Sequence, residues 1–242
     1  MCGSNKLDFF SADLADSRGS TAISIAFDSG GLPGVLLRHT IAAMKGRVPL
    51  WLKLVWSLWL IVWAPLYWRQ YGPANFLFFC DIGNVLIGVA LWLESPLIFA
   101  WAACGLLLFQ TLYCIDLAGA LLTHHHIIGG TEYMFDPHLS LAIRLLSLFH
   151  VVTPPLLLWA IWKLGYDPRG WKFQTVMMWI VVSINYVWHP ELDINWARGL
   201  FFQEQHTMPG FAYLLGYLVV VPICVYLPTH VLLSRLFRDR TS

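Results

Sequence analysis

Residues 96–121 read PLIFAWAACGLLLFQTLYCIDLAGAL, an apolar run in which Asp116 is the single charged side chain. A helix needs roughly 20 apolar residues to cross a bilayer, so this run predicts a membrane-spanning helix. Similar runs occur along the chain, and the candidate spans lie at about 50–68, 76–93, 96–121, 139–163, 173–188 and 211–233. The sequence therefore predicts an all-α, polytopic transmembrane helix bundle of about six spans.

The composition of the whole chain supports a membrane protein. Of its 242 residues, 58% are hydrophobic and 12% are charged, whereas soluble domains carry about a quarter charged residues. The 13 Trp and 9 Tyr suit the aromatic belts at membrane interfaces. A net charge of +1 with no basic arm argues against nucleic acid and leaves membrane lipids as the expected partners. No cofactor-binding motif is present, so no cofactor is expected.

The N-terminal segment is predicted to differ from the rest of the chain. Residues 1–35 are rich in Ser, Asp and Gly and are predicted to form a disordered polar tail, which leaves 36–242 as a single transmembrane domain.

Six spans would place both termini on one side of the membrane. That side would carry Arg38, Lys45, Arg47, Lys53, Lys163, Arg169, Lys172, Arg235, Arg238 and Arg240, and the other side only Arg69 and Arg198. This bias predicts cytoplasmic termini, in what we expect to be a bacterial inner membrane.

Seven polar residues interrupt the predicted spans. They are Cys80, Asp81, Asn84, Asp116, Arg144, His150 and Asn185. At 1.5 Å per helical residue, Cys80 and Asp81 would lie roughly 6–8 Å and His150 roughly 16 Å below the outer surface. All seven then fall in the outer half of the bilayer or near its midplane. Since ionisable groups in hydrocarbon are costly, this pattern predicts a polar pocket.

A thiol and an imidazole in such a pocket could perform acyl transfer. Cys80 would act as the nucleophile and His150 as the base that takes its proton. The amide of Asn185 or Asn84 would stabilise the oxyanion, and Asp81, Asp116 and Arg144 would bind or support the substrate. Pro154 and Pro155 follow His150, so the carbonyls of His150 and Val151 should lose their helical partners and the helix should kink.

Other interpretations of the same residues remain open. Asp81 and Arg144 lie at similar depth and could instead form a buried ion pair. The remaining cysteines of the spans, Cys104, Cys114 and Cys224, are expected to be packing residues. Three consecutive histidines, 124–126, fan around a helix and cannot all bind one ion, so no metal site is expected. Residues 129–137, GGTEYMFDP, are expected to cap the bundle, with substrate gating as the alternative.

Three short motifs resemble a known group of membrane proteins. Phe78-Phe79-Cys80-Asp81-Ile82-Gly83-Asn84, Phe149-His150-Val151-Val152 and Ile184-Asn185-Tyr186 resemble landmarks of the bacterial YwaF-like integral membrane family. That family resembles the plasmalogen-forming acyltransferases and the androgen-induced membrane fatty-ester hydrolases. The chain is also similar to bacterial membrane-associated proteins that carry the Gly-Thr-Glu-Tyr-Met-Phe-Asp loop. The resemblance implies that Cys80 and His150 act together.

These observations lead to three functional hypotheses. The first is a lipid acyl-ester hydrolase or acyltransferase that uses the Cys80–His150 pair. The second is a non-enzymatic small transporter or membrane binding module, since polar groups near the midplane also suit a transport site. The third is that the buried polar residues form a structural network only. A pocket closed toward the inner side would favour the first hypothesis, and a continuous polar route would favour the second.

Overall fold

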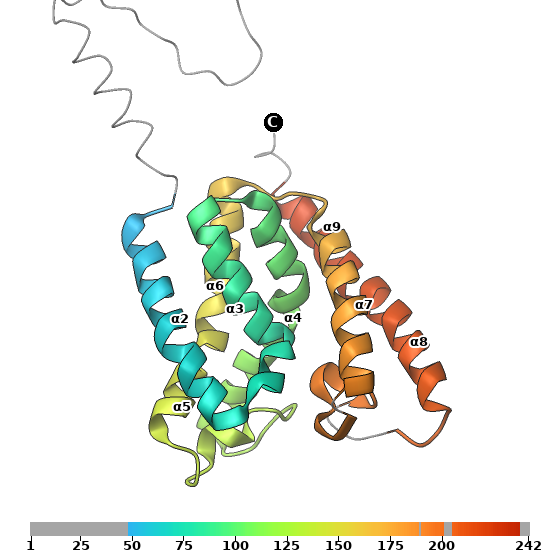
Figure 1. The fold of residues 1–242 in the computed structure, drawn as a ribbon. Coiled ribbons are helices and arrows are strands. Elements are labelled where there is room, and N and C mark those ends of the chain that lie inside the picture. Colours follow the sequence, from blue (N-terminus) through green and yellow to red (C-terminus); the bar gives the residue numbers. More distant parts are fainter. Residues whose placement is uncertain (1–47, 189, 201–204, 238–242) are drawn as a thin grey trace, which may run out of the picture. The chain divides into compact units, whose positions relative to one another are not determined.

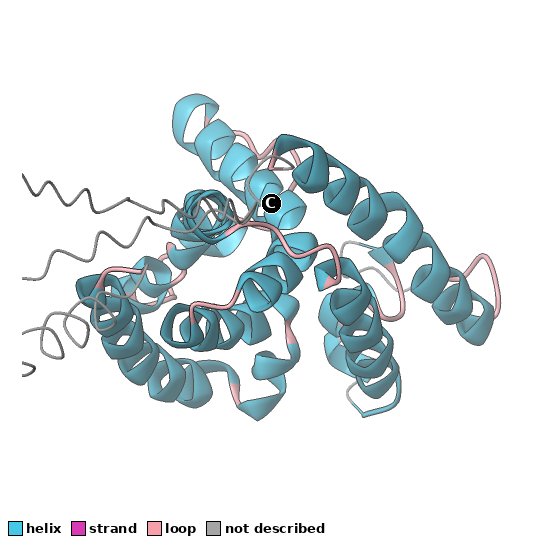
Figure 2. Cartoon of the chain, turned by 90° about the horizontal axis from the view of Figure 1, so that it is seen from above, coloured by secondary structure: helices cyan, strands magenta, loops and turns pink. Residues whose placement is uncertain are grey.

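The computed structural model describes residues 48–188, 190–200 and 205–237, and the regular structure in these ranges is entirely helical (Figures 1 and 2). The prediction of an all-α bundle is confirmed. The predicted tail, residues 1–35, lies outside the described residues, as do Arg38, Lys45, Arg47, Arg238 and Arg240. The division into domains therefore stays a prediction.

Helices occupy every predicted span. They are α2 (Leu50–Tyr71), α3 (Phe79–Leu93), α4 (Pro96–Thr123), α5 (Leu141–Leu146), α6 (Phe149–Leu164), α7 (Gly170–Trp188), α8 (Gly210–Val221) and α9 (Leu227–Leu236). The loops contain the 3-10 turns η1 (Pro73–Leu77), η2 (Glu132–Phe135), η3 (Pro190–Leu192) and η4 (Ile194–Trp196). A π-helical segment, η6 (Pro222–Tyr226), joins α8 to α9.

Within the described residues, length and apolar composition single out four segments that could cross a membrane. They are Leu50–Tyr71, Pro96–Thr123, Leu141–Leu164 and Gly210–Leu236, and the apolar helix α3 is shorter. The third segment contains a break, because α5 ends at Leu146 and α6 begins at Phe149. The two prolines of the predicted kink, Pro154 and Pro155, instead lie within α6. The break at residues 147–148 lies before His150 and was not predicted, and the kink expected at the two prolines stays a prediction.

The helices begin and end at residues whose type favours a helix end. Ser95 and Ser140 cap α4 and α5, since their hydroxyls accept hydrogen bonds from the backbone N–H groups of Ile98 (3.3 Å) and Ile143 (3.4 Å). Gly72, with φ of +78°, ends α2 in a conformation that favours glycine. The polar residues of the spans are thereby held at defined heights along the bundle.

The helices pack around α4. This helix contacts α3, α6 and α7, while α2 packs on α3 and α8 packs on α7 (Figure 1). Many of the side chains between α3, α4 and α6 are fully buried and apolar, and among them are Ile87, Leu91, Phe99, Leu157 and Ile161. In Figure 1, α5 and the loops after α2, α4 and α7 lie at one end of the bundle, and the start of α2 and the whole of α9 lie toward the other. We call these the α5 end and the α9 end.

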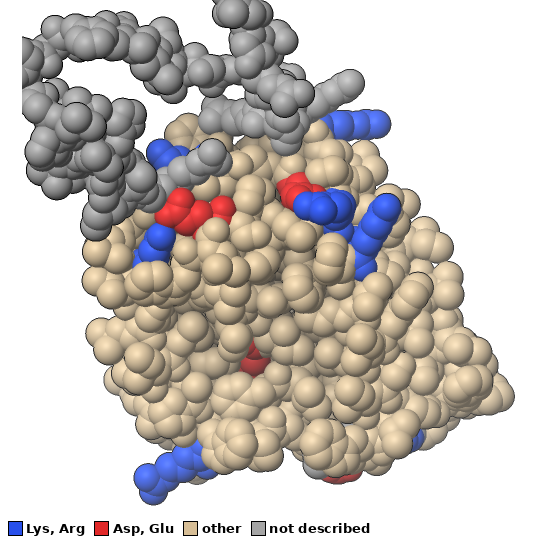
Figure 3. Space-filling model, turned by 45° about the horizontal axis from the view of Figure 1, so that its top comes forward, with Lys and Arg blue, Asp and Glu red and all other residues tan. Residues whose placement is uncertain are grey.

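The outer surface of the bundle is apolar. Large side chains such as Trp51, Leu58 and Val187 are 64%, 64% and 78% exposed. Figure 3 shows a broad band nearly free of charged side chains, with Lys and Arg gathered mainly toward one side of it. An exposed apolar surface of this extent is unfavourable in water and favourable against lipid. The chain therefore has the features of an integral membrane protein.

Candidate functional site

Cys80 and Asp81 lie in the first turn of α3, at the α5 end. Asp81 is 2% exposed and accepts a hydrogen bond of 2.5 Å from Asn75 Nδ2 in the preceding turn η1. Its other oxygen lies 3.8 Å from Cys80 Sγ, which donates to it. The start of a helix favours a negative charge, because the first backbone N–H groups are unpaired there.

Tyrosine hydroxyls surround this turn. Tyr67 of α2 pairs with Ser147 Oγ at 2.5 Å and lies within electrostatic range of Asp81 and Tyr133. Tyr113 of α4 and Tyr133 of η2 share a hydrogen bond of 2.9 Å between their hydroxyls. Burial raises the pKa of Tyr133, which therefore stays a neutral phenol. We call the following set the polar cluster: Tyr67, Cys80, Asp81, Tyr113, Tyr133, Ser147 and His150.

The three tyrosines of the polar cluster were not predicted from sequence. Tyrosine fits an interfacial belt as well as an interior, so its presence near a span end did not single it out. The available signal was that a buried tyrosine hydroxyl needs a hydrogen-bond partner.

His150 is held in place from three sides. Its Nδ1 donates a 2.8 Å hydrogen bond to the carbonyl of Ser147, which can only accept. Its ring stacks on Tyr113 and on Phe149, with ring centroids 4.2 Å and 3.9 Å away. Because Nδ1 carries the proton of this bond, Nε2 of the neutral ring keeps its lone pair. His150 is thus oriented as a base.

The carbonyl of His150 lacks a helical backbone partner, as predicted, but it accepts a hydrogen bond from another helix. Pro154 has no N–H to donate to it, and Cys114 of α4 does so instead, with its Sγ 3.6 Å from the oxygen. Cys114 was expected to be a packing residue only. It joins α4 to α6 at the point where α6 lacks a backbone hydrogen bond.

Cys80 and His150 border the same cluster without bonding to each other. Cys80 packs against the aromatic group that contains Phe149, the neighbour of His150. Both residues lie in the described part of the chain, where Sγ of Cys80 donates to Asp81 and Nδ1 of His150 donates to Ser147. The Cys–His pair stays a prediction, because no hydrogen bond joins the two side chains in this state.

The ion pair considered for Asp81 and Arg144 is not formed. Both lie among the described residues, and Arg144 Nη1 donates to the carbonyl of Met134 at 3.2 Å while Asp81 is bound by Asn75. The two residues share a depth, but the side chain of Arg144 is directed to the loop that follows α4. The expectation failed because depth along the bundle does not decide on which face of a helix a side chain lies.

Asp116 organises the same loop. This carboxylate is fully buried, and its Oδ1 accepts the backbone N–H groups of Ile128 (2.7 Å) and Gly129 (2.9 Å). Its Oδ2 accepts a short hydrogen bond from the hydroxyl of Thr131 and lies 3.0 Å from His126 Nδ1. Asp116 therefore binds backbone and side chains of its own loop, where sequence analysis expected it to bind or support a substrate.

Asp116 and Arg144 hold the loop from both sides of Tyr133. Asp116 binds residues 126–131, and Arg144 binds the carbonyl of Met134. Tyr133 lies between these anchors and reaches Tyr113 in the polar cluster. The predicted cap on the bundle is thus a fixed element that contributes a side chain to the candidate site.

The two asparagines considered for the oxyanion differ in their partners. Asn185 is used structurally, since its Nδ2 donates to the carbonyl of Ile194 at 3.4 Å. Asn84 lies one turn after Cys80 on α3 and is fully buried, and neither atom of its amide has a partner in the described structure. Since Asn185 Oδ1 also lacks a partner in the described structure, Asn84 differs in that its whole amide is unpaired.

Another asparagine, Asn195, was not considered from sequence. Its Oδ1 accepts the backbone N–H of Phe79 at 3.0 Å, and its Nδ2 donates to the carbonyl of Leu77 at 2.7 Å. It thereby caps the helix start that carries Cys80. Its φ of +58° is left-handed, which asparagine tolerates better than most residues.

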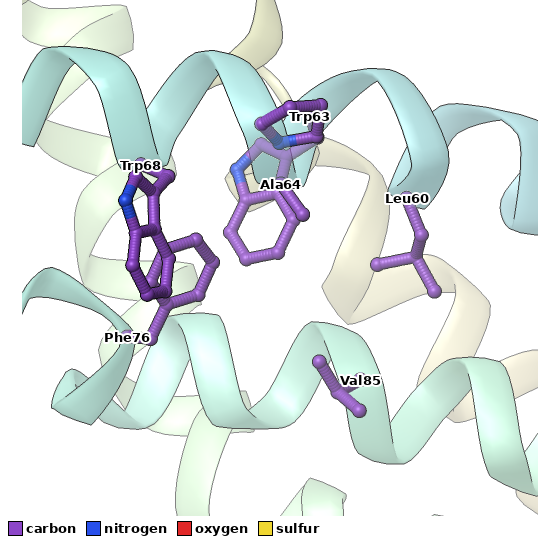
Figure 4. A pocket seen from close by; sticks show the side chains of 7 residues that line it. Leu60, Trp63, Ala64, Trp68, Phe76 and Val85 are labelled. Atoms are coloured by element: carbon purple, nitrogen blue, oxygen red, sulfur yellow. The ribbon is translucent and has the colours of Figure 1, made fainter. Parts of the chain in front are cut away.

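An apolar groove runs between α2 and α3 beside the polar cluster. Its larger part has a volume of about 630 Å³ and is lined by Leu60, Trp63, Ala64, Pro65, Trp68, Phe76 and Val85 (Figure 4). A second part of about 440 Å³ shares Leu60 and Val85 with the first and continues toward Trp92. Trp63 and Phe76 of its wall belong to the same aromatic group as Tyr67 and Cys80. The groove therefore ends against the residues that enclose the cluster.

Comparisons with known proteins do not assign the site. No protein-family model matches the chain, and no curated protein and no solved structure matches it either.

Proposed function

We propose that this integral membrane protein binds a lipid acyl chain and acts on its ester bond as a hydrolase or acyltransferase. The observation that carries the proposal is the groove between α2 and α3, which is apolar along its length and ends beside the polar cluster. A chain lying in this groove would be open to the bilayer on one side. Its ester would then lie near Trp63 and Phe76, with Cys80 behind them. The resemblance to membrane acyltransferases and fatty-ester hydrolases points in the same direction.

The residues would divide the reaction as follows. The thiol proton of Cys80 passes to Nε2 of His150, and the sulfur forms a bond to the acyl carbon. Asn84 Nδ2 donates to the oxyanion of the tetrahedral intermediate. The carbon–oxygen bond of the ester breaks, the leaving alcohol takes the proton from His150, and the acyl group remains on Cys80 as a thioester. Catalytic hydrogen bonds are often absent before the substrate binds, which is compatible with the unbonded pair described above.

The interior below the cluster favours a pocket that is closed on one side. Beyond Asn84 on α3 and Thr153 on α6, the buried side chains of these two helices are apolar, and they include Ile87, Leu91, Leu157 and Ile161. In these two helices, an apolar layer lies between the polar cluster and the α9 end. A closed pocket suits an enzyme better than a conduit, and it supports the first of the three hypotheses.

One observation favours transport as a second candidate. At the α9 end, Tyr166 OH lies 2.8 Å from His230 Nδ1 and 3.4 Å from Cys104 Sγ. These groups supply polar side chains at the end where a transport route would need them. Transport would require the apolar layer to open, and this candidate therefore ranks second.

Trapping of an acyl-enzyme tests the proposed function. The purified protein is incubated in lipid nanodiscs with phospholipids that carry a clickable acyl chain, and label that hydroxylamine releases is measured. We expect label on the wild type, none on Cys80→Ala and at least tenfold less on His150→Gln. Cys104→Ala is the matched control, since it removes a buried thiol of the bundle at the α9 end and should keep the label. Label that persists in Cys80→Ala, or none on the wild type under turnover conditions, would refute the scheme.

The location and orientation in the membrane belong to the same proposal. We propose a bacterial inner membrane with both termini in the cytoplasm, which the distribution of Lys and Arg in the sequence supports. Reporter fusions at each terminus, one active only in the cytoplasm and one only outside it, measure this directly.

A further inference from the structure

Several buried side chains of the described structure have polar atoms without partners, and three of them lie on the helices α3, α4 and α6. Asn84 of α3, Gln110 of α4 and Thr153 of α6 are 0%, 2% and 0% exposed. In the described structure, both amide atoms of Asn84, Oε1 of Gln110 and Oγ1 of Thr153 lack a hydrogen-bond partner. None of these groups is accounted for by the contacts of the polar cluster.

Thr153 departs from the behaviour of other helical threonines in this chain. The hydroxyls of Thr111, Thr123, Thr175 and Thr229 each donate to the carbonyl four residues earlier, at 2.6–2.9 Å. This local bond is the usual way in which a threonine satisfies its hydroxyl inside an apolar helix. Thr153 does not make it, so its hydroxyl remains available to a group in the core.

The packing of the helices places Gln110 and Thr153 at similar heights, with Asn84 roughly 7.5 Å nearer the α9 end at 1.5 Å per residue. A Cβ added to Gly83 would meet the side chain of Leu106, which sets α3 against α4. The bond from Cys114 to the carbonyl of His150 sets α4 against α6 in the same way. In this register Gln110 lies near the level of Thr153.

The directions in which the side chains of Asn84 and Gln110 lean reduce the difference in height between their amide groups. The Cα–Cβ bond of a helical residue is tilted toward the N-terminus of its helix. Because α3 and α4 run in opposite directions, the side chain of Asn84 leans toward the α5 end and that of Gln110 leans toward the α9 end. The two amides therefore approach each other in height.

We propose that Asn84, Gln110 and Thr153 bind one or more water molecules inside the bundle. A polar atom in an apolar core is costly unless it is hydrogen-bonded, and the cost of several such atoms together disfavours a dry site. Buried waters typically make two to four hydrogen bonds to groups of this kind. The three side chains offer donors and acceptors from three different helices, which a bridging water can satisfy together.

We infer that this site supplies the water that hydrolyses the thioester, a role that rests on the proposed function. Asn84 follows Cys80 by one turn, so water held there is close to a thioester formed on Cys80. Attack by water forms a carbon–oxygen bond and breaks the carbon–sulfur bond. One proton of the water passes to His150 and then to the departing sulfur, which restores the thiol. The site would thus make hydrolysis, rather than transfer to a second lipid, the favoured outcome.

Water-edited solid-state NMR of the wild type in lipid tests the site without turnover. Magnetisation is transferred from water protons, and its build-up is followed on the side-chain amide nitrogens of Asn84 and Gln110. Gln174 is the matched control, because it is also buried, at 1% exposure, but its Nε2 donates to Tyr226 OH at 3.3 Å. We expect build-up at Asn84 and Gln110 at least threefold faster than at Gln174. Equal rates at the three amides would overturn the water site.

A second measurement tests the link to hydrolysis. With an alcohol acceptor present, acyl groups are released either as free acid or as a new ester, and the ratio of the two is measured. Gln110→Leu and Thr153→Val should each lower the ratio of acid to ester at least fivefold. Rapid NMR build-up with an unchanged ratio would overturn the hydrolytic role and leave the water site standing. Rapid build-up without any thioester on the wild type would instead refute the proposed function.

Discussion

Removing the carboxylate of Asp116 should release the loop that carries Tyr133. The carboxylate accepts two backbone hydrogen bonds, one from Thr131 and a contact of 3.0 Å from His126, and it is fully buried. In Asp116→Leu these donors lose their acceptor. Breaking a buried charged network of this kind costs roughly 3–5 kcal/mol. For a chain of this size, that corresponds to a fall of roughly 6–20 °C in the thermal midpoint.

The assay combines thermal unfolding in detergent with limited proteolysis of residues 124–139. Asp116→Asn should lose less than Asp116→Leu, because its amide oxygen can still accept both backbone N–H groups. Asp136→Asn is the matched control, since Asp136 also accepts a backbone N–H of this loop, from His138 at 2.8 Å, but at an exposed position. If Asp116→Leu melts within about 2 °C of the wild type, a shift worth less than about 1 kcal/mol, and its loop resists protease equally, the carboxylate does not anchor the loop.

Three further outcomes are expected. Cys114→Ala should lower the free energy of unfolding by about 1 kcal/mol. In a Pro154→Ala background the same substitution should cost nothing, because residue 154 then supplies a backbone N–H to the carbonyl of His150. A double-mutant cycle of thermal midpoints measures this difference. Asn195→Ala should cost roughly 1–3 kcal/mol, because the two groups that it binds at the start of α3 lose their partner; a midpoint equal to that of the wild type would contradict the cap. The guanidinium of Arg169 holds the pKa of Asp167 below its ordinary value. This carboxylate therefore stabilises the folded state above the unfolded pKa of about 3.9, and the contribution is lost as the pH falls through the lower pKa of the folded state. The difference in midpoint between the wild type and Asp167→Asn should accordingly shrink as the pH falls below about 3.9.

The sequence predicted at which end of the bundle the residues of the candidate site lie, but it did not predict most of their contacts. Cys80, Asp81 and His150 do border one polar cluster at the end of the bundle that carries α5. The loss of a backbone partner at the His150 carbonyl was also predictable, because proline has no N–H. Cys114 as the replacement donor was not predictable, since a thiol in an apolar run has no sequence mark that separates packing from bonding.

The contacts of Asp116 and Arg144 show why the depth of a residue along the bundle does not predict its partners. Both residues lie at the expected end of the bundle, and both bind the loop after α4. Position along a helix follows from a rise of 1.5 Å per residue, so the sequence gives height reliably. The direction of a side chain around the helix axis follows from packing, and helices that are apolar on all sides carry no stripe that reveals it.

The sequence by itself determined the all-helical class, the places of the helices and the presence of polar groups within them. These properties follow from the length of apolar runs and from the local chemistry of Ser, Gly and Pro. The tertiary structure alone decided which polar groups meet: three tyrosines join the cluster, Asn185 binds its own loop, and Asn84 keeps a free amide. Such pairings depend on the register and rotation of helices that are distant in the chain, and composition and spacing encode neither.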